Sequence, residues 1–282
     1  MPVPLPAPSP EGRHQVDAII QRISKAVVFL LVPTPDTGAP SSGTGTLVEW
    51  KGKKFLVSAL HCFFPDMGGT AQVIRSWNAT RFGFRDERGL GRTESLNEAE
   101  QRVQPGIGCT IPVSAPEDFL IDSKRDLIAV RIPQNLDALA HAEFINLETD
   151  AFKKDLVTGV SLIALGAPIA SRVHVAGFGE TLIPQVEHVR YDPDLDTSGM
   201  TNETYSPSNF FMPYSLTKDG IAPHGFSGAA VFVNKEPEPD GVWSVSPHIV
   251  GIVQQFAKRK GFLIVRKISA VVELLDTDRN AV

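Results

Sequence analysis

Short runs of branched and aliphatic residues recur along the chain, separated by polar and glycine-rich stretches. Runs of about four to eight such residues, bounded by turn residues, are typical of β-strands. The pattern predicts strands at Val27–Val32, Gly45–Trp50 and Lys54–Ser58, with a tight turn at Lys51–Lys53 between the last two. A short helix is predicted before the first strand, over Gln15–Lys25. Helical periodicity between the strands is missing, so the pattern favours an all-β protein.

Three of the apolar segments carry a residue that is suited to chemistry. A strand ends in a histidine, another strand begins with an aspartate, and a serine is surrounded by small residues that permit a tight backbone turn. The segments are Phe55–Cys62 (FLVSALHC) with His61, Lys124–Ile132 (KRDLIAVRI) with Asp126, and His224–Val231 (HGFSGAAV) with Ser227.

These three residue types together predict nucleophilic acyl transfer. A serine hydroxyl is a weak nucleophile at neutral pH, so Ser227 needs a base that takes its proton. His61 titrates near neutrality and can be that base, and Asp126 can hold its tautomer and stabilise the imidazolium. The attacked carbonyl oxygen becomes negative, and the backbone N–H groups of Gly225 and Ser227 are the candidates for stabilising it, each worth about 3 kcal/mol. Only tertiary folding can bring the three side chains together.

The order and surroundings of these residues resemble the chymotrypsin-like or trypsin-like serine peptidases. The resemblance runs from about residue 26 to about residue 275. It rests on the small-residue strand Gly43–Val48, the histidine motif Ser58–Cys62, the aspartate motif Asp126–Val130, the serine motif Gly225–Val231, the pocket-lining segments Ile249–Val253 and Gly261–Val265, and the closing helix Lys267–Leu275. It implies two antiparallel six-stranded Greek-key β-barrels with a C-terminal α-helix.

The same resemblance implies which residues contact the substrate. Phe256 pointing inward would shorten the specificity pocket and favour small or medium apolar side chains at the cleaved bond. The backbone from Gln254 onward would pair with an extended peptide as an added strand. The floor of the pocket is predicted at Ile221 and Ala222, and its walls at Gln254, Gln255, Phe256 and Gly261.

Three positions depart from the family pattern. Phe226 stands where secreted trypsins carry the aspartate that receives the new N-terminus after zymogen cleavage, so activation by that salt bridge is not expected. Ala229 replaces the second glycine after the serine, and it leaves the backbone uncrowded. Cys62 follows the histidine as in secreted relatives, but Gly43 occupies the place of its partner cysteine. That disulfide therefore cannot form.

Composition narrows the function classes. Hydrophobic residues make up 42% of the chain and charged residues 21%, which suits a globular unit with a large core. A net charge of −5 argues against general nucleic-acid binding, and the basic cluster Lys258–Lys260 predicts a solvated hairpin tip. No apolar run approaches the ~20 residues of a membrane span. His174 and His188 have no third ligand at metal spacing, so neither a metal nor another cofactor is predicted.

Cysteine usage bears on location. Only Cys62 and Cys109 occur in the chain, whereas secreted members of the resembled family are usually stapled by disulfides. Reduced thiols are the simpler expectation, and a Cys62–Cys109 disulfide is the alternative. The segment Met1–His14 is proline-rich and lacks the apolar core of a signal peptide. These features predict a cytoplasmic protein. Because the resemblance is to the simpler members of the family, it also predicts a bacterial origin.

The predicted organisation is a single peptidase domain with two halves. Residues 1–14 form a disordered tail, residues 15–145 a first barrel that carries His61 and Asp126, and residues 146–282 a second barrel with Ser227, the pocket and the C-terminal helix. Residues 75–116 are longer than compact relatives need and predict an insertion. Residues 191–208 form a second long polar segment, before the serine loop, that can gate the site.

The sequence therefore predicts an intracellular serine endopeptidase that cleaves a protein or peptide through an acyl-enzyme. We expect a partner or ligand that activates it by reshaping residues 198–225, because a cytoplasmic protease without a zymogen switch needs some restraint. An α/β-hydrolase esterase is disfavoured, since it places serine before acid before histidine and needs a glycine where Ala229 stands. The stronger alternative is a catalytically inert or latent trypsin-fold binding protein.

Overall fold

The structure is a computed structural model of the chain of 282 residues. It describes residues 18–20, 22–32, 41–64, 76–81, 83–84, 103–104, 108–112, 118–133, 142–166, 172–175, 179–182, 185–195, 197, 206–215, 222–234, 247–258 and 260–278.

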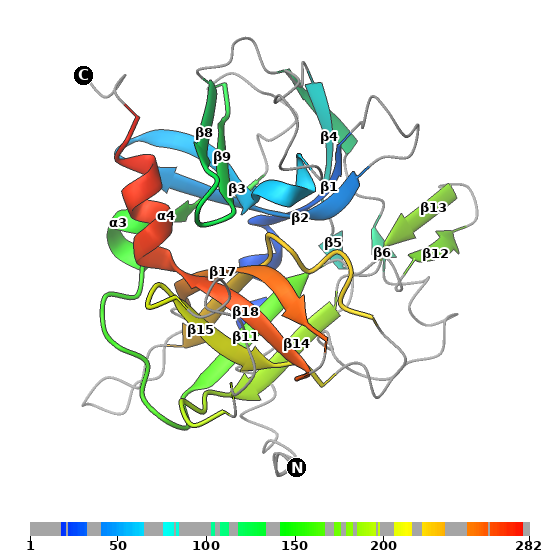
Figure 1. The fold of residues 1–282 in the computed structure, drawn as a ribbon. Coiled ribbons are helices and arrows are strands. Elements are labelled where there is room, and N and C mark those ends of the chain that lie inside the picture. Colours follow the sequence, from blue (N-terminus) through cyan, green and yellow to red (C-terminus); the bar gives the residue numbers. More distant parts are fainter. Residues whose placement is uncertain are drawn as a thin grey trace.

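The first half of the chain forms one curled sheet of eight strands (Figure 1). Along the sheet the order is β7-β4-β1-β2-β3-β9-β8, and β10 pairs with β2 in parallel. The strands are β1 (Val27–Val32), β2 (Ser41–Trp50), β3 (Lys53–Ala59), β4 (Ser76–Arg81), β7 (Gly108–Pro112), β8 (Phe119–Asp122), β9 (Leu127–Arg131) and β10 (Ile145–Asn146).

The second half forms a six-stranded antiparallel sheet in the order β14-β11-β16-β17-β18-β15. Its strands are β11 (Ser161–Gly166), β14 (Gln185–Arg190), β15 (Asn209–Pro213), β16 (Ala230–Asn234), β17 (Pro247–Ala257) and β18 (Phe262–Lys267). Two short ribbons complete the strands, β5 (Gly83–Phe84) with β6 (Val103–Gln104) and β12 (Arg172–Val175) with β13 (Gly179–Leu182).

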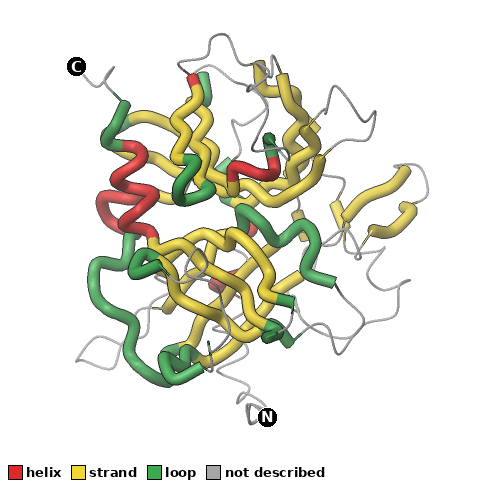
Figure 2. Tube along the Cα trace, in the orientation of Figure 1, coloured by secondary structure: helices red, strands yellow, loops and turns green. Residues whose placement is uncertain are grey.

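Helical segments are short. Residues 18–20 and 22–24 are helical before β1, followed by the 3-10 turn η1 (Leu60–Cys62), α3 (Leu147–Asp150) and the closing helix α4 (Ile268–Leu275). Figure 2 shows the strands filling both halves of the molecule, with α4 at one side of the junction between them.

The strands between the two halves are buried on both faces, and alternate residues reach different cores. In β3, Phe55 and Val57 belong to a core shared with the second sheet, whereas Leu56 belongs to the core inside the first sheet. In β16, Phe232 reaches the shared core and Val231 the interior of the second sheet. This division follows from the two-residue period of a strand. It explains why these segments read as continuous apolar runs.

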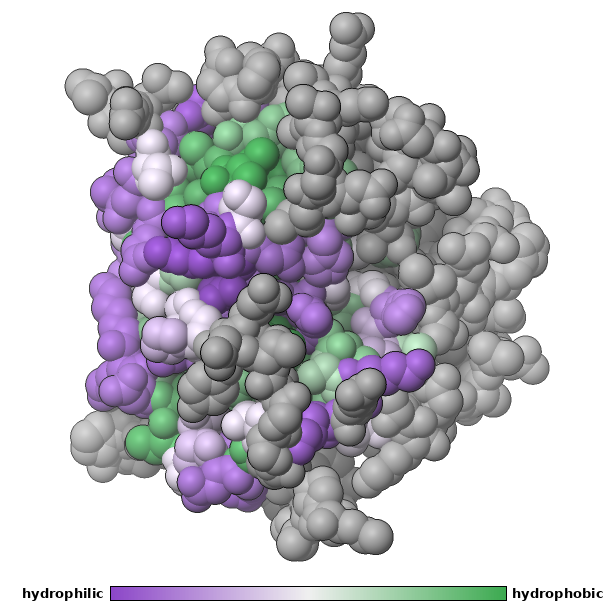
Figure 3. Space-filling model, in the orientation of Figure 1, coloured by the Kyte–Doolittle hydropathy of each residue, from purple (hydrophilic) through white to green (hydrophobic). Residues whose placement is uncertain are grey.

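The helix α4 and its C-terminal turn fasten the two halves together. Its buried face packs into the shared core. Just after it, Asp276 accepts hydrogen bonds from Trp50 and Lys51, and Asp278 pairs with Lys53 at 3.0 Å. These cations come from the β2–β3 hairpin of the first sheet. Hydrophilic residues accordingly gather on the side of the molecule where α4 lies (Figure 3).

The predicted all-β, two-barrel architecture with a C-terminal helix is confirmed. The first sheet has eight strands instead of six, partly because the short β10 adds to β2. The β2–β3 turn also agrees with its sequence: Lys51 and Gly52 both have positive φ, 50° and 73°. Positive φ at both central residues is what the type I′ turn of a two-residue β-hairpin needs. The predicted tail and most of the predicted insertion lie outside the described residues.

Candidate active site

The β3–β9 ladder brings the histidine to the aspartate. Ala59 at the end of β3 lies opposite Leu127 at the start of β9, so His61 and Asp126 leave neighbouring strand ends. The backbone N–H of Leu60 donates to the Asp126 carbonyl at 3.1 Å. The N–H of His61 donates to Asp126 Oδ1 at 3.0 Å. Backbone hydrogen bonds thus fix the two residues before their side chains interact.

Asp126 adopts a backbone conformation that few side chains tolerate. Its φ is 52°, in the left-handed region, where aspartate and asparagine are found more often than other non-glycine residues. The turn aims the carboxylate at the imidazole. Its Oδ2 lies 2.8 Å from His61 Nδ1, while Oδ1 receives the His61 N–H. Both carboxylate oxygens therefore act on one histidine.

Ser227 completes the arrangement from the second sheet. Its Oγ lies 3.0 Å from His61 Nε2. The serine stands between Gly225 and Gly228, which have φ of 103° and 89°. A Cβ on Gly228 would lie 1.8 Å from the Thr44 carbonyl oxygen, so the close approach of β2 requires glycine there. The three predicted residues thus form one hydrogen-bonded chain, in which the base His61 lies between the acid Asp126 and the nucleophile Ser227.

Two threonines of β2 hold the serine loop from the other half of the molecule. Thr44 donates its backbone N–H to the Ser227 carbonyl at 2.8 Å and its hydroxyl to the Gly225 carbonyl at 2.5 Å. The Thr46 hydroxyl donates to the Gly228 carbonyl at 3.1 Å. Thr44 and Thr46 share one face of β2 because they are two residues apart. Sequence analysis identified this strand only by its small residues, and the alternation of glycine with threonine was the available signal.

The histidine is electrostatically tuned by its surroundings. Burial lowers the pKa of His61, but the hydrogen bond to Asp126 and the neighbouring Cys62 raise it, and the net pKa lies above its ordinary value of 6.5. The carboxylate thus stabilises the imidazolium. The side chain remains 39% exposed, so solvent or a ligand can reach it. A histidine in this setting is a stronger base toward the serine proton.

The serine loop contains the two backbone N–H groups that were predicted to stabilise the oxyanion, those of Gly225 and Ser227. The Phe226 carbonyl accepts from Ala229 N–H at 2.8 Å, and the Ser227 N–H points the opposite way because the peptide unit is trans. Within the described part of the chain, neither the Gly225 nor the Ser227 N–H donates to another group of the protein. These N–H groups are therefore available to a ligand beside Ser227 Oγ.

Phe226 anchors the loop in the interior. It is 1% exposed, and its ring fills the space that a Cβ on Gly166 would occupy, 2.7 Å from Cδ1. Tyr214 packs edge-on against both Phe226 and Phe256, with a distance of 5.5 Å between ring centroids in each pair. The position of the family's activation aspartate thus holds a buried aromatic ring in this chain.

Cys62 is a buried free thiol, as expected from Gly43. A Cβ on Gly43 would lie 2.5 Å from Cys62 Sγ, so the sulfur fills the space opposite the glycine. The thiol contacts the Ser227 carbonyl at 3.7 Å. Because Cys62 is free, the alternative Cys62–Cys109 disulfide is not formed, and the side chain of Cys109 lies outside the described residues.

The residues predicted to contact substrate are placed differently from one another. Gln255 is exposed and Phe256 is half-buried, and both follow Gln254 on β17. Gln254 is only 4% exposed, and its amide is directed at the backbone of Arg125 and Asp126 instead of a pocket. Ala222 is exposed, Gly261 has a φ of 71°, and Ile221 lies outside the described residues. His224, at the start of the serine loop, is exposed.

Among the described residues, no group of three or more histidine, cysteine, aspartate or glutamate side chains could hold a metal ion. A search of the same residues finds no helix that is long and apolar enough to cross a membrane.

Comparison with known proteins gives structural matches only. No protein-family model and no curated protein matches the chain. The thermostable serine protease AL20 from an extremophilic microorganism has a TM-score of 0.50 at 14% identity, covering 89% of this chain and 95% of that one. The protease Anisep of Arthrobacter nicotinovorans has a TM-score of 0.48 at 12% identity, covering 86% of this chain and 90% of that one. The serine endoprotease of Yersinia pestis has a TM-score of 0.48 at 10% identity, covering 97% of this chain and 68% of that one. The match to AL20 shows that the chain shares the two-barrel fold of a serine protease.

Proposed function

We propose that this protein is a serine endopeptidase that cleaves peptide bonds through Ser227, His61 and Asp126. The observation that carries the proposal is the continuous hydrogen-bonded path from Asp126 Oδ2 to His61 Nδ1 at 2.8 Å and from His61 Nε2 to Ser227 Oγ at 3.0 Å. Nucleophile, base and orienting acid in this order are what acyl transfer by serine requires.

In the first half of the reaction, Ser227 Oγ attacks the carbonyl carbon of the substrate while His61 Nε2 takes the hydroxyl proton. The carbonyl oxygen becomes an oxyanion and accepts hydrogen bonds from the N–H groups of Gly225 and Ser227, the roles predicted for them. Collapse of this intermediate breaks the C–N bond. The leaving amine receives the proton from His61, and an acyl ester of Ser227 remains.

In the second half, a water molecule attacks the ester carbonyl and gives its proton to His61 Nε2. The second tetrahedral intermediate collapses, the C–Oγ bond breaks, and the proton returns from His61 to Ser227. The carboxylic acid product leaves. Asp126 stays ionised throughout and stabilises the imidazolium each time it forms.

The edge of β17 supports a peptide or protein as substrate. Pairing between β16 and β17 ends at Ala230 and Ile252, whereas pairing with β18 continues to Ala257. Among the described residues, the stretch 255–257 therefore has a partner strand on one side only. An extended peptide can add to the other side and run from there toward Ser227.

The restraint and the location remain part of the proposal. We propose a cytoplasmic, bacterial protease with a specific protein target, activated by a partner that acts on residues 198–225. The buried free Cys62 and Phe226 at the activation position support it. Peptide cleavage by the isolated protein should rise when cell extract is added. Full activity of the isolated protein, with no gain from extract, would contradict the restraint.

The test of the catalytic proposal is covalent labelling with a fluorophosphonate probe. We expect labelling of the wild type and none of Ser227→Ala. Ser161→Ala is the matched control, because Ser161 Oγ is also hydrogen-bonded to a histidine, His188, on the second sheet. Ser161→Ala should label like the wild type. A folded wild type that does not label in the presence or absence of extract favours the inert binding protein instead.

A further inference from the structure

Gln254 contacts the turn that carries Asp126 from the opposite half of the molecule. It lies on β17 of the second sheet and is 4% exposed. Its Nε2 donates to the carbonyl oxygens of Arg125 and, at 3.2 Å, of Asp126. A side-chain amide has two N–H donors, and two neighbouring carbonyls occupy both. The amide orientation is therefore set by the turn.

The side chain reaches the turn because β17 is irregular at this point. Val253 pairs with Val265 and Gln255 with Ile264, so the register shifts and Gln254 is the extra residue. A bulge of this kind breaks the two-residue alternation and redirects a side chain, and bulges are frequent beside active sites. Gln254 thus points at the first sheet, away from the predicted pocket wall.

The turn needs such support because of its conformation. Asp126 has a φ of 52°, which is unfavourable for a residue with a side chain. Its carbonyl accepts from Leu60 N–H at 3.1 Å and from Gln254 at 3.2 Å. Fixing the carbonyls on both sides of Asp126 fixes its backbone, and the backbone aims the carboxylate at His61.

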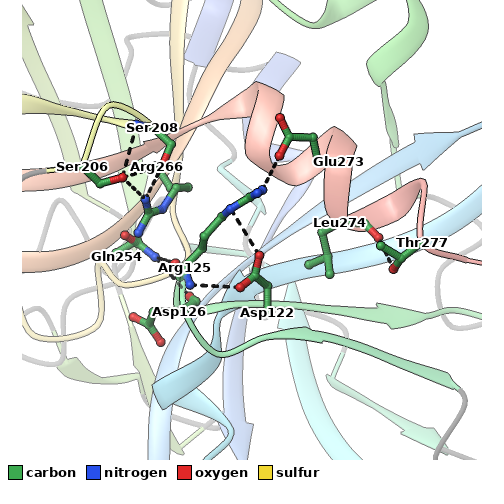
Figure 4. A network of polar contacts seen from close by, with 10 residues as sticks. All are labelled: Asp122, Arg125, Asp126, Ser206, Ser208, Gln254, Arg266, Glu273, Leu274 and Thr277. Carbon is green, nitrogen blue, oxygen red and sulfur yellow. Dashed lines mark hydrogen bonds and ion pairs between the residues drawn. The ribbon is translucent and has the colours of Figure 1, made fainter. Parts of the chain in front are cut away.

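The other contacts of the turn are weaker (Figure 4). Arg125 pairs with Asp122 at 3.3 Å and with Glu273 of α4 at 2.5 Å. Glu273 is 61% exposed, and an ion pair this open to solvent contributes little. Arg266, 5% exposed, lies beside Gln254 in the same view, and its bonds go to the Ser206 and Ser208 hydroxyls. Gln254 is thus the buried side chain of the second sheet that contacts the backbone of the turn.

We propose that Gln254 is a positioning residue, which holds the Asp126 turn so that the carboxylate orients His61. The inference rests on the proposed function, in that Asp126 and His61 serve Ser227. Gln254 touches no reacting atom, so its removal should misalign the base without removing it. Misplacement of a base on the scale of 1 Å can slow a reaction by about 10²-fold.

The test compares Gln254→Met with Gln185→Met. Methionine keeps the length of the side chain but donates no hydrogen bond, and Gln185 is a half-buried glutamine of β14, at the edge of the second sheet. We expect fluorophosphonate labelling to slow by about 10- to 100-fold in Gln254→Met, and by less than about 2-fold in Gln185→Met. Unfolding midpoints establish whether both variants fold. If Gln254→Met does not fold, Gln254→Asn takes its place, because the asparagine side chain is too short to reach both carbonyls.

A second readout separates this inference from the proposed function. The pKa of His61, followed by NMR titration of its ring, requires no turnover. The groups acting on this ring are Asp126 and Cys62, and we expect Gln254→Met to lower the pKa toward 6.5 because the Asp126 hydrogen bond weakens. A lowered pKa in a protein that never labels leaves the positioning role standing and defeats the proteolytic one. An unchanged pKa, or an equal fall in Gln185→Met, overturns the positioning role whatever the labelling rate.

Discussion

The serine loop and the aspartate turn of the candidate site differ in how much close packing holds them. The serine loop combines hydrogen bonds from β2 with close packing: glycines at positive φ, the β2 backbone against Gly228, and the buried ring of Phe226. The aspartate turn is fixed by polar contacts: Gln254 on its carbonyls and Arg125 paired with carboxylates. Packing tolerates no added atom, whereas a polar network tolerates isosteric exchange.

The difference teaches where the chemistry can be altered without loss of the fold. Substitutions in the aspartate turn should change reactivity more than stability. Substitutions in the serine loop should change stability first. This contrast can be tested on the same protein, with labelling rate and free energy of unfolding as the two measurements.

The largest effect is expected for Asp126→Asn. The asparagine keeps an acceptor for the His61 N–H, so the fold should persist, but the wrong imidazole tautomer is favoured. Labelling should fall by about 10⁴-fold. The free energy of unfolding, from urea denaturation, should fall by about 1.5 to 3 kcal/mol, because the hydrogen bond between the charged His61 and Asp126 is lost. Loss of the fold would show that the turn depends on the carboxylate charge and would break the comparison.

The pH dependence sharpens the same prediction. In the wild type, labelling should rise with pH as His61 loses its proton, with a midpoint above 6.5 because the folded-state pKa is raised. Stability from the His61–Asp126 pair is complete below pH 6.5 and is lost as pH rises through the folded-state pKa. In Asp126→Asn the midpoint should fall toward or below 6.5. A midpoint that does not move would contradict the assigned cause.

Gly228→Ala should be the most destabilising single methyl. Its Cβ would lie 1.8 Å from the Thr44 carbonyl and 2.2 Å from Ser58 Oγ, at a φ of 89°. We expect a loss of more than about 4 kcal/mol in the free energy of unfolding, because backbone must move. Gly52→Ala is the control: φ is 73°, nothing lies within 4 Å, and only the local strain of about 1 kcal/mol applies. Equal stability of the two variants would refute the packing account.

Phe226→Ala removes the buried anchor of the serine loop. Truncating a buried phenylalanine costs about 3 to 5 kcal/mol. Phe256→Ala should lower the free energy of unfolding by less than half as much, because Phe256 is only half-buried, although it belongs to the same aromatic stack through Tyr214. Thermal and urea unfolding measure both. If Phe226→Ala retains wild-type stability, the ring is not what holds the loop.

The smallest effect is expected for Lys51→Ala, at the tip of the β2–β3 hairpin. Lys51 is 55% exposed and its partner Asp276 45%, so the pair should contribute less than about 1 kcal/mol and less still at high salt. Lys53→Ala should cost more, because its partner Asp278 is only 5% exposed. Urea denaturation at low and high salt distinguishes them. An equal effect would mean that burial does not decide the strength of these pairs.

Local pattern determined much of the fold and of the site. The apolar runs located β1, β3, β9 and β18 to within a few residues, because burial on both faces leaves a continuous apolar signature. The residues His61, Asp126 and Ser227 were identifiable because each follows or precedes such a strand in a short, characteristic context. The absence of the resembled family's disulfide followed from Gly43, whereas only the structure showed that Cys62 is free.

Tertiary structure decided the contacts that cross between the two sheets. Thr44 and Thr46 meet the serine loop, and Gln254 meets the Asp126 turn, only because the two halves pack face to face. Sequence assigned Gln254 to a pocket wall, since strand alternation gives no warning of a bulge. Periodicity reports which face of an element is buried. Register and bulges, which determine the atoms met on that face, depend on the whole fold.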